Sequence, residues 1–284
     1  QELVKAFKKD EDYEVHAWDR EDIDITSEKE VAAKISGLKP EVIINAAAYN
    51  AVDRCEEDSK EYALAKKLNG KAPGYLAKAA KKIKAAMVHY STDYVFGGEM
   101  PEIPEPAGCT GSCGSCGLHA GFTPQIGFDE NAKPKPVSNY GRSKLMGEKE
   151  VAKNAKNYYI IRLSKLFGKP AQSEAAKRSF FDVMLEVGKK NKEVKAVDEE
   201  TSCFTYAPDL AKKTKEIIEA KKPSGIYHVV NSEPCTWYEA VLELYQQAKL
   251  KTKVVPVPGS EFPRPAQRPY FSVLLNTKLN PLRS

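Results

Sequence analysis

The sequence has no hydrophobic run long enough to cross a membrane. A membrane-spanning helix needs about 20 consecutive apolar residues, and no stretch of the 284-residue chain approaches that length. The chain also does not open with the basic and apolar segments of a secretory signal peptide. We therefore expect a soluble, cytoplasmic protein that has no membrane partner.

The sequence also has only six cysteines and a small net charge. Of the six cysteines, Cys55, Cys203 and Cys235 are scattered singly, which is typical of ordinary small side chains in a reducing compartment. The formal net charge is only +5, and the lysines between residues 78 and 84 are typical of the solvated face of a helix. This charge pattern argues against a nucleic-acid partner.

One motif places a tyrosine and a lysine four residues apart, at the start of a helix predicted over residues 138–153. The motif is Tyr-Gly-Arg-Ser-Lys at residues 140–144. Four residues make about one helical turn, so the Tyr140 phenol and the Lys144 ammonium share a face. The ammonium is expected to lower the pKa of the phenol, which suits acid–base work on a carbonyl or alcohol. The alternative is an ordinary helix in which this spacing has no function.

A second motif follows the apolar run at residues 85–88. It reads His-Tyr-Ser-Thr-Asp-Tyr-Val-Phe at residues 89–96. A short apolar run is typical of a buried parallel strand, and ligands of open α/β sheets bind at the carboxyl ends of such strands. Ser91 and Thr92 are therefore placed where they could hydrogen-bond a substrate oxygen.

Together, Ser-Thr-Asp-Tyr-Val-Phe at 91–96 and Tyr-Gly-Arg-Ser-Lys at 140–144 resemble the dTDP-4-dehydrorhamnose reductase family of extended short-chain dehydrogenase/reductases. The resemblance implies an α/β fold, a Rossmann-type doubly wound parallel sheet with a smaller substrate-binding lobe. Residues 1–168 would form the dinucleotide-binding domain. Residues 169–284 would form mainly the substrate-binding lobe, intermixed with the cofactor domain.

The resemblance also implies a reaction and its residues. The reaction is NAD(P)H-dependent reduction of the 4-keto group of a nucleotide-linked deoxysugar, of the dTDP-4-dehydrorhamnose to dTDP-rhamnose type, in cell-surface polysaccharide synthesis. The implied catalytic residues are Thr92, Tyr140 and Lys144. The implied cofactor-binding residues are Asp19, Arg20, Asp24, Ile25, Ala47, Ala48, Tyr49, Asn50, Tyr90, Tyr140 and Lys144. The implied substrate-binding residues are Thr92, Asp93, Tyr94 and Lys165.

Two positions depart from the family pattern. Asn50 stands where members usually have threonine, and Lys165 stands where they usually have a tryptophan that contacts the sugar. A carboxylate and a guanidinium, Asp19 and Arg20, end the strand predicted over residues 13–19. They suit an adenosine ribose and a 2′-phosphate respectively, so the choice between NADH and NADPH stays open. The sequence also leaves open a need for Mg²⁺ and a homodimeric state.

A dinucleotide-binding fold normally opens with an apolar strand and a glycine-rich turn, whose backbone N–H groups hold the pyrophosphate. Residues 1–9 instead place Leu3, Val4 and Phe7 on one face of a predicted helix. We expect that the first strand and the glycine-rich turn are missing from this sequence. Residues 1–284 alone are then expected to bind NAD(P)H poorly.

A loop insertion at residues 102–122 holds four potential metal ligands within eleven residues, Cys109, Cys113, Cys116 and His119. Zinc sites usually use two well-separated pairs of ligands, so a structural metal is the less favoured interpretation. A three-cysteine iron–sulfur loop is only a superficial match. We expect a mobile loop that contains a disulfide or free thiols and no bound metal.

Two other functions fit parts of the pattern. One is an NAD-dependent nucleotide-sugar epimerase or dehydratase, which uses the same tyrosine and lysine. The other is a non-catalytic regulatory subunit resembling the β subunit of methionine adenosyltransferase. The reductase-like stretch at residues 91–96 argues against the first. The intact Thr92, Tyr140 and Lys144 argue against the second.

Overall fold

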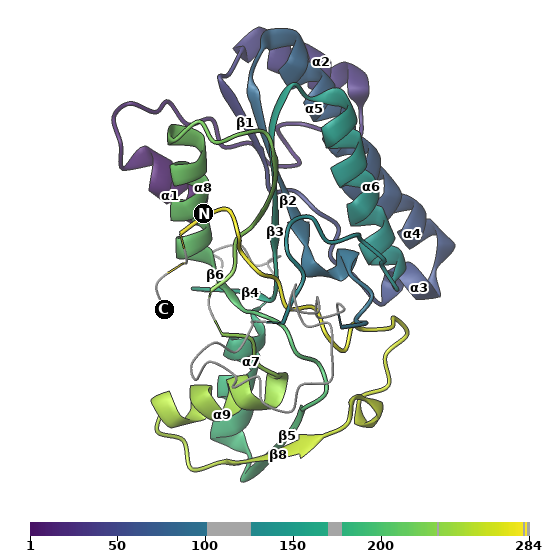
Figure 1. The fold of residues 1–284 in the computed structure, drawn as a ribbon, viewed down its shortest axis with the longest axis vertical. Coiled ribbons are helices and arrows are strands. Elements are labelled where there is room, and N and C mark those ends of the chain that lie inside the picture. The colour runs from purple at the N-terminus through teal and green to yellow at the C-terminus, as the bar shows by residue number, and fades with distance from the viewer. Residues whose placement is uncertain (101–125, 170–177, 232, 281, 283–284) are drawn as a thin grey trace, which may run out of the picture.

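A parallel β-sheet lies at the centre of the larger lobe. The computed structural model describes residues 1–100, 126–169, 178–231, 233–280 and 282. The largest sheet has the strand order β1-β2-β3-β7, and all its pairs are parallel (Figure 1). Its strands are β1 Val42–Asn45, β2 Ala86–Thr92, β3 Asn157–Leu163 and β7 Gly225–His228. The all-parallel order confirms the predicted α/β class.

Helices cover both faces of this sheet (Figure 1). One face carries α2 Glu28–Leu38, α5 Ala72–Ile83 and α6 Asn139–Asn154. The other face carries α1 Glu2–Lys8 and α8 Ala207–Glu219. The core under the first group contains Val31, Leu76, Met87, Val151 and Ile160. The core under α8 contains Val88, Ile161, Leu210, Ile217 and Tyr227. Three layers around one parallel sheet make the doubly wound arrangement.

The connection from β1 to α5 is a series of short helical segments. They are α3 Arg54–Glu57, α4 Ser59–Ala65 and the π-helical segment η1 Lys66–Lys71. The 3₁₀ segment η2 Asp93–Val95 follows β2 directly. The predicted helix at 138–153 is α6, which begins because the Ser138 side chain accepts a hydrogen bond from the Gly141 N–H.

A smaller lobe lies below the sheet in Figure 1. Parallel strands β5 Glu193–Val197 and β8 Lys253–Val257 pack against helices α7 Phe180–Lys190 and α9 Trp237–Gln247. The short strands β4 Leu166–Phe167 and β6 Thr205–Tyr206 pair with each other, and η3 Gly259–Glu261 follows β8. Because α8 and β7 return to the large sheet from the second half of the chain, the two lobes are intermixed in sequence.

The predicted strand at residues 13–19 is wrong for this structure. These residues have no strand partner among the described residues, and Trp18 is 38% exposed. A strand is defined by its ladder of hydrogen bonds, and within the described sheet β1 pairs only with β2. The side-chain pattern of residues 13–19 therefore has no neighbouring strand against which it could form a sheet.

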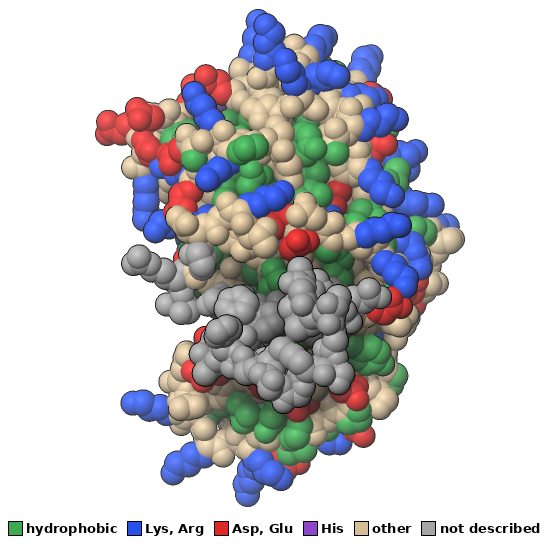
Figure 2. All heavy atoms as spheres, viewed as in Figure 1, with side chains coloured by type: hydrophobic (Ala, Val, Ile, Leu, Met, Phe, Trp, Pro, Cys, Tyr) green, Lys and Arg blue, Asp and Glu red, His purple; other side chains and the backbone are tan. Residues whose placement is uncertain are grey.

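The surface in Figure 2 shows Lys and Arg side chains scattered along the outer edges of this face, with Asp and Glu among them. Within the described parts of the chain, no helix combines the length and the apolar character that a membrane crossing requires.

Gly147 lets α6 approach η1 closely. A Cβ atom at this position would lie 2.1 Å from the Asn69 carbonyl oxygen, which is backbone and cannot rotate away. We expect Gly147→Ala to lower the free energy of unfolding by about 1–3 kcal/mol or more. Gly37→Ala in α2 is the matched control, because no atom lies within 4 Å of its Cβ position. That control should be neutral or stabilising. Urea denaturation that ranks the two variants equally would contradict the close packing.

Candidate active site

A cavity of about 600 Å³ opens at the carboxyl ends of β2 and β3, where the sequence placed the site. The walls come from both lobes. They bring together nine of the predicted site residues, namely Ala48, Asn50, Tyr90, Thr92, Asp93, Tyr94, Tyr140, Lys144 and Lys165. Ala46, Ala48 and Asn50 contribute from the segment after β1, and α6 contributes the Tyr–Lys pair. The fold therefore brings these nine residues to one cavity, and their roles stay predictions.

Thr92 and Asp93 lie where β2 turns into η2. The Thr92 hydroxyl donates to Asp93 Oδ1 over 3.0 Å, and Asp93 Oδ2 accepts from Ser164 over 2.7 Å and from Ser272 over 2.6 Å. Asp93 is only 2% exposed. Burial raises the pKa of the Asp93 carboxyl, while its three hydroxyl donors lower it. The carboxylate thus ties the ends of β2 and β3 to the segment near Ser272.

Tyr140 lies at the first turn of α6 with a buried ring. Its hydroxyl donates to Asn50 Oδ1 over 3.4 Å, and its ring meets the Tyr94 ring edge-on at 5.8 Å between centroids. Burial raises the pKa of the Tyr140 phenol, the Asp93 carboxylate raises it further, and the nearby Thr92 hydroxyl lowers it. The phenol therefore keeps its proton at neutral pH, as a proton donor must.

The pKa of Tyr140 is raised in this structure and not lowered as expected, because loss of hydration around the phenolate is the dominant influence. Lys144 is 2% exposed, and its Nζ donates to the Tyr90 carbonyl oxygen over 2.6 Å. Burial lowers the pKa of Lys144 to about 8, and the Glu148 carboxylate one turn further along α6 opposes that shift. The amine is therefore largely cationic at neutral pH.

A buried ion pair between Arg162 and Glu148 lies next to the site. Arg162 donates to Glu148 through Nε over 2.9 Å and through Nη2 over 2.7 Å. Ser91, which directly precedes Thr92, donates to Glu148 Oε1 over 2.5 Å. This group joins β2, β3 and α6 just below the cavity. Sequence reasoning missed it, although Glu148 lies four residues after Lys144 and thus on the same helical face.

Several predicted cofactor residues lie away from the cavity. Asp19 and Asp24 hold local turns, since Asp19 accepts from the Glu21 N–H and Asp24 accepts from the Thr26 N–H and hydroxyl. Arg20 is exposed beside Asp19. Others of this set, Ile25, Ala47 and Tyr49, do not line the cavity described here. Their roles stay predictions.

The predicted metal ligands Cys109, Cys113, Cys116 and His119 lie outside the described residues. Among the residues that the structure does describe, no group of three His, Cys, Asp or Glu side chains is placed to hold a metal ion.

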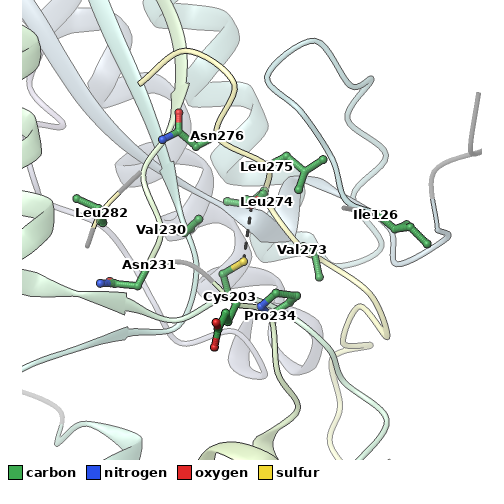
Figure 3. A pocket seen from close by; sticks show the side chains of 11 residues that line it. Ile126, Cys203, Val230, Asn231, Pro234, Val273, Leu274, Leu275, Asn276 and Leu282 are labelled. Carbon is green, nitrogen blue, oxygen red and sulfur yellow. Dashed lines mark hydrogen bonds between the residues drawn. The ribbon is translucent and has the colours of Figure 1, made fainter. Parts of the chain in front are cut away.

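A second, smaller cavity of about 170 Å³ lies beside Cys203 (Figure 3). Its walls are mostly apolar and include Val230, Val273 and Leu274, and the Cys203 thiol donates to the Leu274 carbonyl oxygen over 3.7 Å. It lacks the convergent hydroxyl, phenol and amine groups of the larger cavity. The larger cavity is therefore the candidate active site.

The two cavity lysines make stability depend on pH. Burial lowers the pKa of both Lys144 and Lys165 to about 8, whereas a lysine in an unfolded chain titrates near roughly 10.4. Between these values the unfolded state binds more protons, so each lysine makes the free energy of unfolding rise with pH. The slope is at most about 1.4 kcal/mol per pH unit for each lysine.

We expect Lys144→Met and Lys165→Met each to reduce this slope in urea denaturation between pH 8 and pH 10. The slope of each variant is compared with the slope of the parent, because the thiols of Cys55, Cys203 and Cys235 also titrate in this pH range. Burial raises the pKa values of these thiols, so they make the free energy of unfolding fall with pH in the parent and the variants alike. Exposed Lys189→Met is the matched control. Parent and Lys144→Met slopes that coincide would show that the folded lysine has an ordinary pKa.

The comparisons with known proteins show the family of the chain. The chain matches the family described as "RmlD substrate binding domain" over residues 1–283. It is 31% identical to a dTDP-4-dehydrorhamnose reductase of Burkholderia thailandensis, covering 92% of this chain and 82% of that protein. It is 30% identical to the spore coat polysaccharide biosynthesis protein SpsK of Bacillus subtilis, covering 92% of this chain and 80% of that protein.

Solved structures give the same result. A dTDP-4-dehydrorhamnose reductase from Clostridium acetobutylicum is 34% identical, with a TM-score of 0.81 over 96% of this chain and 86% of that one. The Bacillus anthracis enzyme in complex with NADP is 30% identical, with a TM-score of 0.81 over 97% of this chain and 87% of that one. On sequence and structure alike, the chain belongs to the dTDP-4-dehydrorhamnose reductase family.

Proposed function

We propose that this protein reduces the 4-keto group of a nucleotide-linked deoxysugar with NAD(P)H, in a reaction of the dTDP-4-dehydrorhamnose to dTDP-rhamnose type. One observation supports this most: Thr92, Tyr140 and Lys144 line a single cavity at the carboxyl ends of β2 and β3. A protonated phenol, a buried amine and a hydroxyl are the groups that a carbonyl reduction requires. Membership of the reductase family supplies the substrate class.

The residues around Lys144 fit a nicotinamide cofactor. Its ammonium uses one N–H on the Tyr90 carbonyl, which leaves donors for a ribose, and the small side chains of Ala46 and Ala48 leave room beside it. When bound, the cofactor supplies the hydride for the carbonyl carbon. We favour NADPH, because Arg20 could pair with a 2′-phosphate and the Bacillus anthracis relative binds NADP.

Tyr140 provides the proton. As negative charge develops on the carbonyl oxygen, the phenol transfers its proton to that oxygen and becomes a phenolate. The Lys144 ammonium then stabilises the phenolate by its charge. Thr92 would contact the same carbonyl oxygen by turning its hydroxyl proton away from Asp93 Oδ1, to which it donates here. The Tyr140 phenol, which donates to Asn50 Oδ1 over 3.4 Å, would likewise turn its proton from Asn50 to the carbonyl oxygen.

The full-length gene product, incubated with NADPH and dTDP-4-dehydrorhamnose, tests this proposal. We expect nicotinamide absorbance to fall with one NADPH oxidised for each sugar reduced. Conversion of the sugar without net oxidation of NADPH would instead indicate an epimerase or dehydratase. A pure folded protein that leaves both compounds unchanged would indicate a non-catalytic subunit.

A further inference from the structure

Eight lysines lie at the end of the larger lobe where the strands of the main sheet begin. Val42, Ala86 and Asn157, the first residues of β1, β2 and β3, are register partners, so the connections that lead into these strands lie at one end of the sheet. The connections into β1, β2, β3 and β7 are residues 39–41, 84–85, 155–156 and 220–224. Together with the last turns of α5 and α6, they carry the lysines that we call the basic end: Lys39, Lys81, Lys82, Lys84, Lys153, Lys156, Lys221 and Lys222.

The charge of the basic end is available to a partner. Lys222 is half-buried and the other seven lysines are exposed. None of the eight forms an ion pair with a carboxylate that the structure describes. Glu41 is the one acidic residue in the four connections, and the two glutamates in the last turn of α8 already pair with lysines of that helix. Figure 2 shows Lys and Arg side chains at this end, at the top of the view.

Three of these lysines have a backbone conformation that normally favours glycine. Lys39, Lys84 and Lys221 follow the ends of α2, α5 and α8, with φ of 52°, 63° and 44°. A left-handed residue at the end of a helix is usually glycine, because a Cβ atom is unfavourable there. A cation near the end of a helix is favourable, but α5 already has Lys81 and Lys82 in its last turn. Lysine at these positions therefore adds positive charge against the local backbone preference.

The composition of the basic end indicates the kind of partner. The four connections contain no arginine, no aromatic residue and no large apolar residue. Surfaces that bind nucleic acid usually add aromatic stacking to their charge, and this end offers none. Lysine is a hydrated point charge on a flexible stem, which suits the diffuse negative charge of lipid headgroups. An anionic membrane surface also allows several connections to make contact at once.

We propose that the basic end binds the surface of a membrane that contains anionic lipids, by charge alone. The cavity of the candidate active site opens at the opposite ends of β2 and β3, so it stays accessible when the protein is bound. Surface binding of this kind requires no spanning helix. The inference therefore revises the expectation of no membrane partner, which considered only spanning segments and signal peptides. It does not depend on the proposed function.

Sedimentation of the full-length protein with sucrose-loaded vesicles tests this proposal. We expect binding to phosphatidylcholine vesicles that contain phosphatidylglycerol, and no binding to vesicles of phosphatidylcholine alone. Binding should decrease steeply when NaCl is raised from about 0.1 M to about 1 M, because salt screens exposed charges. A lysine close to an anionic membrane contributes a factor of about five in affinity. The combined variant Lys81→Gln, Lys82→Gln, Lys153→Gln and Lys156→Gln should therefore weaken binding at least about 100-fold.

A matched control removes the same number of charges from the smaller lobe. Lys189→Gln, Lys192→Gln, Lys249→Gln and Lys251→Gln change four exposed lysines near α7, β5 and the end of α9. This combined variant should bind the anionic vesicles within about threefold of the parent, because membrane attraction falls off within a Debye length of the surface. Equal losses in the two combined variants would show that net charge alone causes binding, and would overturn the proposal.

A second variant separates membrane binding from the stability of the helix ends. Lys39→Gly, Lys84→Gly and Lys221→Gly together should weaken binding at least about 10-fold. The urea midpoint should stay equal to that of the parent or rise, because glycine is favoured in the left-handed conformation. A variant that loses stability and keeps its binding would show that the lysines serve the helix ends, and would overturn the proposal.

Two results with the parent protein would also overturn the proposal. One is a failure to bind the anionic vesicles at low salt. The other is binding of poly-glutamate through the same lysines without binding of vesicles, which would assign the basic end to an acidic protein partner. Loss or presence of reductase activity bears only on the proposed function, so the two proposals are tested separately.

Discussion

Tyr140→Phe in the full-length protein is expected to lower kcat by at least about 100-fold, while the affinity for NADPH stays within a few-fold. The ring fills the same space against Tyr94, so packing in the cavity is kept. Only the hydroxyl is lost, and with it the proton that the carbonyl oxygen must receive. Stopped-flow absorbance with saturating dTDP-4-dehydrorhamnose measures kcat, and fluorescence titration measures NADPH affinity.

Tyr90→Phe is the matched control for this prediction. Tyr90 lines the same cavity, but its hydroxyl is hydrogen-bonded to the Thr214 hydroxyl at 2.7 Å and so has a partner of its own. Removal of the Tyr90 hydroxyl should therefore change kcat by only a few-fold. If Tyr140→Phe keeps parental activity, or if both variants lose activity equally, Tyr140 is not the proton donor.

Arg162→Met is expected to destabilise the protein by about 3–5 kcal/mol, because it leaves the Glu148 carboxylate buried without its partner. The two side chains are 1% and 4% exposed, so water cannot replace the guanidinium. Glu148 also accepts from Ser91, and it lies one turn beyond Lys144. We therefore expect activity to fall together with stability. Urea denaturation gives the free energy of unfolding.

Two controls define the effect of the buried pair. Lys78→Met breaks an exposed pair with Glu28, whose side chains are 51% and 52% exposed, and should cost less than about 1 kcal/mol. The double variant Glu148→Gln with Arg162→Met removes both charges and should recover part of the stability. An Arg162→Met variant no less stable than Lys78→Met would rule out a significant role for the buried pair.

Much of the larger lobe could be predicted from local pattern. The apolar run at residues 85–88, followed by hydroxyl side chains, predicted β2 and a ligand site at its end. Ser138, two residues before Tyr140, marks the start of α6. These signals are local, because a buried parallel strand and a helix cap each depend on a few adjacent residues. Residues 13–19 mix apolar and polar side chains and were also predicted to be a strand, yet they are not a strand here. Strand formation also requires a neighbouring strand, which no local pattern supplies.

The pKa of Tyr140 and the contact between Trp237 and Lys165 could not be predicted in this way. Spacing along α6 shows that Lys144 is near Tyr140, but it does not show that burial outweighs a neighbouring charge. Trp237 reaches Lys165 only because α9 packs in the smaller lobe, more than seventy residues further along the chain. The capping box from Thr236 to Glu239 marks the start of α9 and gives no sign of the cavity.

Isotope transfer tests the central claim most directly. The full-length protein is incubated with dTDP-4-dehydrorhamnose and NADPH that carries deuterium at the transferred position of the nicotinamide, and the product is analysed by nuclear magnetic resonance. A 4-keto reductase places the deuterium on C4 of the sugar, and the proton from Tyr140 on the adjoining oxygen. Deuterium at C4 of dTDP-rhamnose is the result we predict. A converted sugar without deuterium at C4, while the labelled NADPH stays unoxidised, would contradict it.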